Sequence, residues 1–257
     1  MVVNEDRFKA VVKEFMEGRG FRYSPIPERK DLTPDFQLFV DDEEYTVELK
    51  FKGLSPEENK ACSDASSEKG GDEKAFPMAY RNSFASSFEE GKRQIEAFDP
   101  ERRSFRLLWL HATGTFSRAI YHNLRSTIFG TETFMSRDFD YTLTCYFFHE
   151  SLFFTHKDID GTIITNDDED LQLCVNPYSK RYNDFIECKL CESFSDALCD
   201  PQKLKSEPNV LVADCSIPRR KMDKVIEYLQ KKYEISHLER FPMTFYQFTS
   251  SIKQPQT

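Results

Sequence analysis

Two carboxylates and one lysine lie close together in the sequence, in a pattern that suits hydrolysis of a charged ester. Pro34-Asp35 opens a short apolar run, and Glu48-Leu49-Lys50 closes the next one. Carboxylate oxygens are the ligands that Mg²⁺ and other hard divalent cations take in proteins. A lysine beside such an ion can position the water that the ion activates, or stabilise charge on a phosphoryl oxygen. The trio therefore predicts metal-assisted cleavage of a phosphodiester bond.

The elements that must position this trio have the pattern of a β-hairpin. Residues 36–40 and 45–52 are rich in β-branched and aromatic side chains, and apolar residues recur at about every second position, which predicts two strands. The acidic residues 41–44 between them predict a tight turn and hence antiparallel pairing. Because side chains alternate along a strand, Glu48 and Lys50 are expected to point toward the same face and one site.

The motif and its surroundings resemble the PD-(D/E)xK nuclease superfamily, whose restriction-endonuclease-like core runs helix, three strands, helix, strand. Residues 5–18 carry apolar side chains at helical spacing, and residues 21–23 predict a short first strand. After the hairpin, residues 80–98 predict a helix and residues 104–111 a buried strand. The resemblance, which extends to about residue 111, implies an α/β fold with a mixed central sheet flanked by helices.

The resemblance also implies roles for the trio. Asp35, Glu48 and the backbone carbonyl of Leu49 would hold Mg²⁺ or Mn²⁺, and Lys50 would orient the attacking water or stabilise charge on the phosphoryl oxygens. Carboxylates around a lysine favour its charged form, so we expect electrostatic stabilisation. The implied partner is nucleic acid, specifically DNA, and cutting both strands implies a homodimer. Two alternatives remain: a solvated strand face, and a nuclease-fold module that binds nucleic acid or a protein without cutting.

Two further site residues are implied by polar groups that members of this family contribute from the flanking helices. On the first helix Glu14 fits this place better than Glu17, and on the second helix Gln94 fits it, followed by Lys92. Polar residues on an amphipathic helix also commonly face solvent. We therefore expect Glu14 and Gln94 at the site, with a solvent-facing position as the alternative for each.

The resemblance divides the chain into a nuclease-like core at residues 1–128 and a C-terminal α/β extension at residues 129–257, which can also be continuous with the core. Within the core, residues 53–79 are polar and rich in serine, glycine and acidic side chains, which predicts a flexible loop. In the extension, a small meander of strands is predicted at residues 141–154, 161–165 and 171–175.

Composition limits the remaining possibilities. The 257 residues carry a formal net charge of -9, which argues against a general nucleic-acid coat protein but is compatible with a nuclease whose charges are segregated. The first residues lack the basic start and apolar stretch of a secretory leader, so we expect a cytoplasmic protein without a membrane span. An odd count of 7 cysteines fits reduced thiols. Cys188 and Cys191 have zinc-ligand spacing, but without a second such pair we interpret them as buried thiols.

Overall fold

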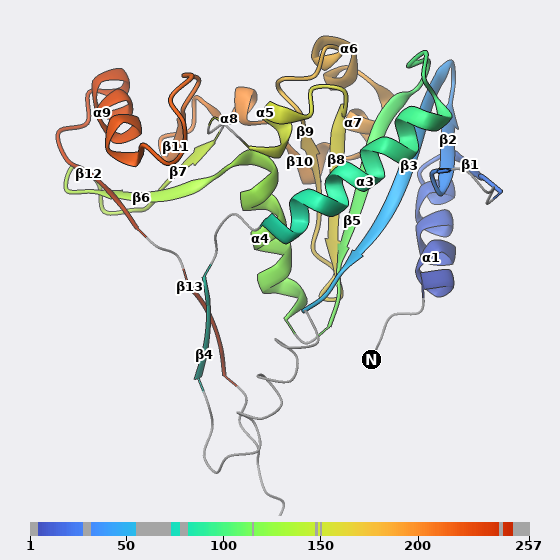
Figure 1. Ribbon diagram of the computed structural model, residues 1–257, viewed down its shortest axis with the longest axis horizontal. Helices are drawn as coiled ribbons and strands as arrows, with labels where there is room; N and C mark the ends of the chain where they lie inside the picture. Colours follow the sequence, from blue (N-terminus) through green and yellow to red (C-terminus); the bar gives the residue numbers. More distant parts are fainter. Residues whose placement is uncertain are drawn as a thin grey trace, which may run out of the picture.

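A computed structural model describes residues 5–27, 32–54, 73–77, 82–114, 116–146, 149, 151–241 and 244–248 of the chain. Seven strands form the central sheet: β1 (Arg22–Pro25), β2 (Phe36–Val40), β3 (Glu43–Lys52), β5 (Phe105–Ala112), β8 (Gly161–Asn166), β9 (Leu171–Val175) and β10 (Leu198–Cys199). Their order in the sheet is β1-β2-β3-β5-β8-β9-β10 (Figure 1). The predicted α/β class, with a mixed central sheet flanked by helices, is confirmed.

The pairing of the strands explains why the sheet is mixed. β1, β2 and β3 form an antiparallel meander, and β3, β5 and β8 run parallel to one another. Parallel neighbours need a crossover connection, and α3 (Asn82–Phe98) lies between β3 and β5 in the chain. β9 is antiparallel to β8, and β10 is parallel to β9. The hairpin of β2 and β3 has the predicted antiparallel arrangement, although its turn is shorter than expected because β3 already begins at Glu43.

One face of the central sheet is covered by α1 (Glu5–Gly18), α6 (Tyr182–Ile186) and α7 (Lys189–Ser193). Val12 of α1 and Val47 of β3 belong to the apolar cluster on this face, and both are almost completely buried. Alternate side chains of β3 therefore point toward α1, as the period of two predicts. The opposite side chains of β3 point toward α3.

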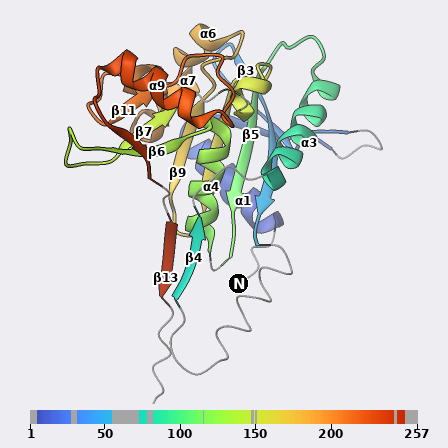
Figure 2. The same cartoon turned by 60° about the vertical axis from the view of Figure 1, so that its left-hand side comes forward.

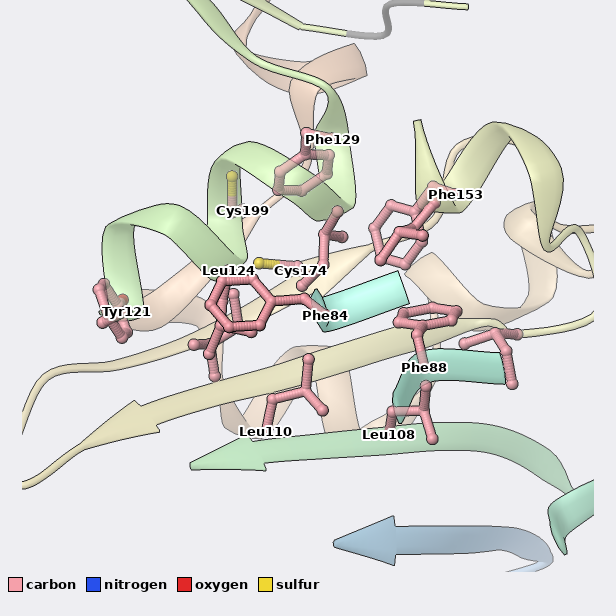
Figure 3. Packing of buried hydrophobic residues seen from close by; sticks show 14 of the residues in the cluster. Phe84, Phe88, Leu108, Leu110, Tyr121, Leu124, Phe129, Phe153, Cys174 and Cys199 are labelled. Carbon is pink, nitrogen blue, oxygen red and sulfur yellow. The ribbon is translucent and has the colours of Figure 1, made fainter. Parts of the chain in front are cut away.

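The second face is covered by α3, α4 (Ser117–Phe129) and α5 (Leu152–Thr155). Figure 3 shows Phe88 of α3 above Leu108 of β5, with Leu110 on the same strand face. Every residue of β5 is buried, because helices cover the sheet on both sides of this strand. Its largely apolar sequence is typical of a central parallel strand.

A second sheet follows α4 and consists of four strands: β6 (Glu132–Ser136), β7 (Leu143–Tyr146), β11 (Val210–Val212) and β12 (Leu238–Arg240). Their order is β11-β7-β6-β12, and α9 (Met222–Tyr233) packs on one face of this sheet (Figure 2). The short helix α8 (Pro201–Leu204) precedes β11. Every helix in the described part of the chain is too short or too polar to cross a membrane.

The predicted meander in the C-terminal half is wrong for its first strand, whereas β8 and β9 pair antiparallel as predicted. β7 lies in the second sheet, whereas β8 and β9 extend the central sheet beside β5. Residues from both sides of the expected boundary at 128 therefore share one sheet. The prediction grouped β7 with β8 and β9 because consecutive strands are neighbours more often than not.

The flexible loop predicted for residues 53–79 falls largely on residues 55–72 and 78–79, which lie outside the described residues. At β4 (Glu73–Pro77) the prediction is wrong, because this segment pairs antiparallel with β13 (Thr244–Phe248) in a two-stranded sheet. Figures 1 and 2 show this ribbon extending away from both larger sheets. Its partner strand is far downstream in the sequence, so the local composition carries no sign of the pairing.

Candidate functional site

The candidate site lies where β2 ends and leaves the edge of β3 uncovered. Phe36, the first residue of β2, pairs with Val47, so β3 continues beyond its neighbour from Glu48 onward. A cleft of about 680 Å³ opens at this edge, and α1, β3 and the segment preceding β2 contribute to its wall. Since side chains from both faces of a sheet can meet only at an edge, this position brings together groups from α1 and from the α3 side.

Asp35 is held at the uncovered edge of β3 by two interactions. Its Oδ2 accepts a hydrogen bond from the backbone N–H of Leu49 at 2.8 Å, and its Oδ1 lies 2.7 Å from Nζ of Lys9. The N–H and C=O of one strand residue face the same edge in an antiparallel pair. The Leu49 carbonyl therefore faces the same side as Asp35, where the resemblance implied a backbone ligand.

Glu48 is a buried carboxylate next to Asp35, with only 3% of its surface exposed. Its Oε1 lies 2.9 Å from Nζ of Lys50, whereas its buried Oε2 receives no hydrogen bond from an N–H or O–H donor among the described residues. The Glu48 carboxyl group also lies within hydrogen-bonding reach of the Asp35 carboxylate. Burial and the nearby negative charge of Asp35 raise the pKa of Glu48 to about 8, against the opposing influence of Lys50. This carboxylate therefore pays a desolvation cost that its neighbours do not fully offset.

Lys50 is fixed by three oxygen acceptors, which matches the three donors of an ammonium group. Besides Glu48, its Nζ donates to Oε1 of Gln94 at 2.8 Å and to Oε1 of Glu90 at 3.2 Å. Burial alone would lower the pKa of Lys50, but its bonds with Glu48 and Glu90 outweigh burial and raise the pKa. Lys50 is therefore a fixed cation on the wall of the cleft.

Gln94 connects α3 to the segment that carries Asp35. Its Nε2 donates to the backbone carbonyl of Thr33 at 3.0 Å, while its Oε1 accepts from Lys50. The amide therefore sets the position of Lys50 relative to the start of β2. Lys92, the alternative to Gln94 as a site residue on this helix, pairs instead with Glu96 of the same helix, with Nζ 3.6 Å from Oε1.

The structure brings together Asp35, Glu48, Lys50 and Gln94, but the placement of Glu14 at the site is wrong. Glu14 is exposed, and α1 contributes Glu5 and Lys9 to the cleft instead. Five residues separate Glu14 from Lys9, which corresponds to about 140° around the helix axis. The spacing of Glu5 and Lys9 marks an i,i+4 pair in the sequence. It does not show that this pair faces Asp35.

Gly91 allows α3 to approach Glu48 closely. A Cβ added at Gly91 would lie 2.6 Å from Cδ2 of Leu108 and 3.2 Å from Cγ of Glu48. We expect overpacking in Gly91→Ala to lower the free energy of unfolding by about 1–3 kcal/mol. At a helix position with free space, the same substitution would instead raise the free energy of unfolding by about 1 kcal/mol. Urea denaturation measures this change.

Gly18→Ala is the matched control for this substitution. Gly18 is the last residue of α1, and a Cβ added there would meet nothing within 4 Å. We expect the stability of the Gly18→Ala protein to equal or exceed that of the wild type. Equal stability of Gly91→Ala and Gly18→Ala would contradict the close packing of α3 on Glu48.

The donor set fits a hard divalent cation. Mg²⁺ is usually bound through one or two carboxylates and keeps several of its waters, and here Asp35, Glu48 and the Leu49 carbonyl face one edge. The unpartnered Oε2 of Glu48 is the atom that such an ion would satisfy. Within the described residues, no cluster of three or more His, Cys, Asp or Glu side chains could hold a metal. The site therefore suits an ion that relies on water for most of its ligands.

The two cysteines with zinc-ligand spacing lie elsewhere. Cys188 and Cys191 are free and are 2% and 3% exposed. They belong to the apolar cluster that includes Phe185 and Leu190. Their surroundings are those of small apolar side chains in a core.

Comparisons of the chain with protein-family models, with curated proteins and with solved structures gave no match. The function of the cleft must therefore be inferred from its own residues. Their geometry joins two carboxylates, a fixed ammonium group and an uncovered strand edge in one place.

Proposed function

We propose that this protein is a metal-dependent endonuclease of the PD-(D/E)xK type that hydrolyses phosphodiester bonds in DNA. One observation carries the proposal: a buried carboxylate with an unpartnered oxygen, Glu48, lies between Asp35 and the fixed cation Lys50. A carboxylate in such a place is costly to the fold. Binding of a divalent cation would offset this cost, which supports a metal-binding role.

The charges that line the cleft support a phosphodiester substrate. Three carboxylates and two ammonium groups contribute to its wall, from Glu5, Asp35, Glu48, Lys9 and Lys50. When all five are ionised, these groups leave one negative charge, which a divalent cation would turn into one positive charge. A phosphodiester carries a single negative charge, so the loaded cleft would attract it.

The chain's own residues have separate tasks in this proposal. A bound divalent cation supplies a Lewis acid that lowers the pKa of a coordinated water. Lys50 stabilises the negative charge that develops on the phosphoryl oxygens, because Glu48 and Gln94 hold its ammonium group in place. Its third acceptor, Glu90, has a side chain that is 53% exposed, so this bond is the one that substrate can replace at the lowest cost.

The order of elements supports the same family. A helix, three antiparallel strands, a crossover helix and a parallel strand follow one another as α1, β1, β2, β3, α3 and β5, with β4 inserted before α3. The resemblance places its motif on the second and third of these strands. Asp35 directly precedes β2, and Glu48 and Lys50 lie on β3.

A cleavage assay tests the proposal. Purified protein is incubated with supercoiled plasmid, linear duplex DNA, single-stranded DNA and RNA, in Mg²⁺, in Mn²⁺ and in a chelator. We expect cleavage of DNA that requires the divalent cation. Absence of cleavage of every substrate in both metals would contradict the proposal.

The second candidate is a nuclease-fold module that binds nucleic acid or a protein without cutting. The formal net charge of -9 favours its protein-binding form, because both a nuclease and a nucleic-acid-binding module must attract a polyanion. Binding of DNA or of a protein without metal-dependent cleavage would identify this function. For the enzyme, we further propose a cytoplasmic location, which suits the free cysteines of the described chain, and a homodimer for double-strand cleavage.

A further inference from the structure

Lys9, which lines the cleft, binds the oxygen of Asp35 that the backbone of β3 does not. Its Nζ lies 2.7 Å from Oδ1 of Asp35 and 2.9 Å from Oε1 of Glu5, one turn earlier on α1. The other Asp35 oxygen is bound to the backbone of Leu49. In this state both carboxylate oxygens of Asp35 are already engaged.

We infer that Lys9 is an internal cation that holds the metal position of Asp35 until a divalent ion takes its place, and that the released ammonium group then binds the substrate phosphate. The inference rests on the proposed function, since it assigns Asp35 as a metal ligand. It adds a residue from α1 that both controls access to the site and contacts the substrate.

Electrostatics favour this exchange, in which a divalent ion replaces the ammonium group of Lys9 at Asp35. An ammonium group and a divalent cation on the same carboxylate repel each other strongly in a partly buried cleft. Because Nζ of Lys9 lies only 2.7 Å from Oδ1 of Asp35, an ion bound to this oxygen would be in direct contact with the ammonium group. Binding of the ion therefore requires Lys9 to move away from Asp35.

The position of Lys9 gives it a place to move. Its side chain is 28% exposed and lines the same cleft as Lys50. Glu5, whose side chain is 59% exposed, keeps the ammonium group at the rim once Asp35 is released. A cation at the rim is available to a phosphodiester that enters the cleft.

Substitution of Lys9 by methionine separates the two roles. Methionine keeps most of the aliphatic stem but removes the charge, so we expect Mn²⁺ to bind about tenfold more tightly to Lys9→Met than to the wild type. Calorimetric titration with Mn²⁺ measures this change. Lys13→Met is the control, because Lys13 lies on the same helix with a half-exposed side chain and pairs only loosely with Glu17, at 3.9 Å. Lys9→Arg, which keeps the charge, should bind Mn²⁺ like the wild type.

DNA affinity provides the second readout. A short DNA duplex is titrated in Mn²⁺ against Lys50→Ala protein, in which cleavage is suppressed, with and without Lys9→Met. We expect Lys9→Met to weaken DNA binding about tenfold, since one phosphate contact is lost. The two effects therefore have opposite signs. A general loss of structure would weaken both metal and DNA binding.

The outcomes distinguish this inference from the proposed function. Tighter Mn²⁺ binding together with weaker DNA binding supports the exchange. If the wild type binds Mn²⁺ but Lys9→Met leaves the Mn²⁺ affinity unchanged, or moves both affinities in the same direction, the exchange is wrong and the proposed function stands. If the wild type binds no Mn²⁺ at all, both are wrong.

Discussion

Replacing Lys50 by alanine is expected to reduce metal-dependent DNA cleavage by about 100- to 1,000-fold, which is the usual cost of removing a charge that stabilises a transition state. Lys50 is the fixed cation of the cleft, held by Glu48, Gln94 and Glu90. Alanine leaves the strand pairing of β3 intact, so the fold should persist. Cleavage rates measured in Mg²⁺, together with circular dichroism, separate the loss of activity from a loss of structure.

Lys52→Ala is the matched control for Lys50→Ala. Lys52 is two residues further along β3, so it shares a face with Lys50, but its Nζ donates to Ser87 and it is not among the residues that line the cleft. We expect it to change the cleavage rate less than about threefold. Undiminished cleavage by Lys50→Ala protein would refute the assigned role.

Replacing Glu48 by glutamine is expected to abolish metal binding and yet stabilise the metal-free protein by about 1–2 kcal/mol. Glutamine is neutral, so folding no longer has to keep a proton on residue 48 beside Asp35, and its amide nitrogen supplies a donor where Oε2 receives no hydrogen bond from a donor among the described residues. Calorimetry with Mn²⁺ and urea denaturation in a chelator measure the two effects. Activity and stability therefore oppose each other at this residue.

The stability of the metal-free protein should also depend on pH through Glu48. Because the pKa of Glu48 is raised from 4.5 to about 8, the folded protein keeps a proton that the unfolded chain releases in this range. Stability in a chelator should therefore fall as pH rises from 4.5 to 8, by about 2–4 kcal/mol, and less in Glu48→Gln protein. Glu90→Gln is the control, since Glu90 binds the same lysine but is exposed. An identical pH profile for Glu48→Gln and the wild type would contradict the assignment.

The hairpin that carries the site was predictable because its pattern is local. Alternation along β3 identified Glu48 and Lys50 as neighbours on one face, and the observed separation of 2.9 Å between Oε1 and Nζ agrees with that prediction. The position of Asp35 followed from antiparallel pairing across a short turn. The prediction of Gln94 required only the correct face of one helix, since α3 follows β3 and packs over it.

The α1 contribution was not predictable in the same way. Glu14 and Glu5 are both acidic residues on an amphipathic helix, and the choice between them depends on which side of α1 faces the sheet edge. That side is set by contacts of Val12 and Met16 with strands that come later in the chain. The pairing of β8 depends likewise on β5, which lies far away in the sequence. Such pairings arise from tertiary packing, which local patterns do not encode.

Location of the metal ion tests the central claim most directly. Crystals of the protein soaked in Mn²⁺ are measured for anomalous scattering, which locates the ion independently of any activity. We predict a peak within about 2.3 Å of carboxylate oxygens of Asp35 and Glu48, next to the Leu49 carbonyl, and its absence in Glu48→Gln crystals. A peak elsewhere, or an empty cleft in fully soaked wild-type crystals, would contradict the account.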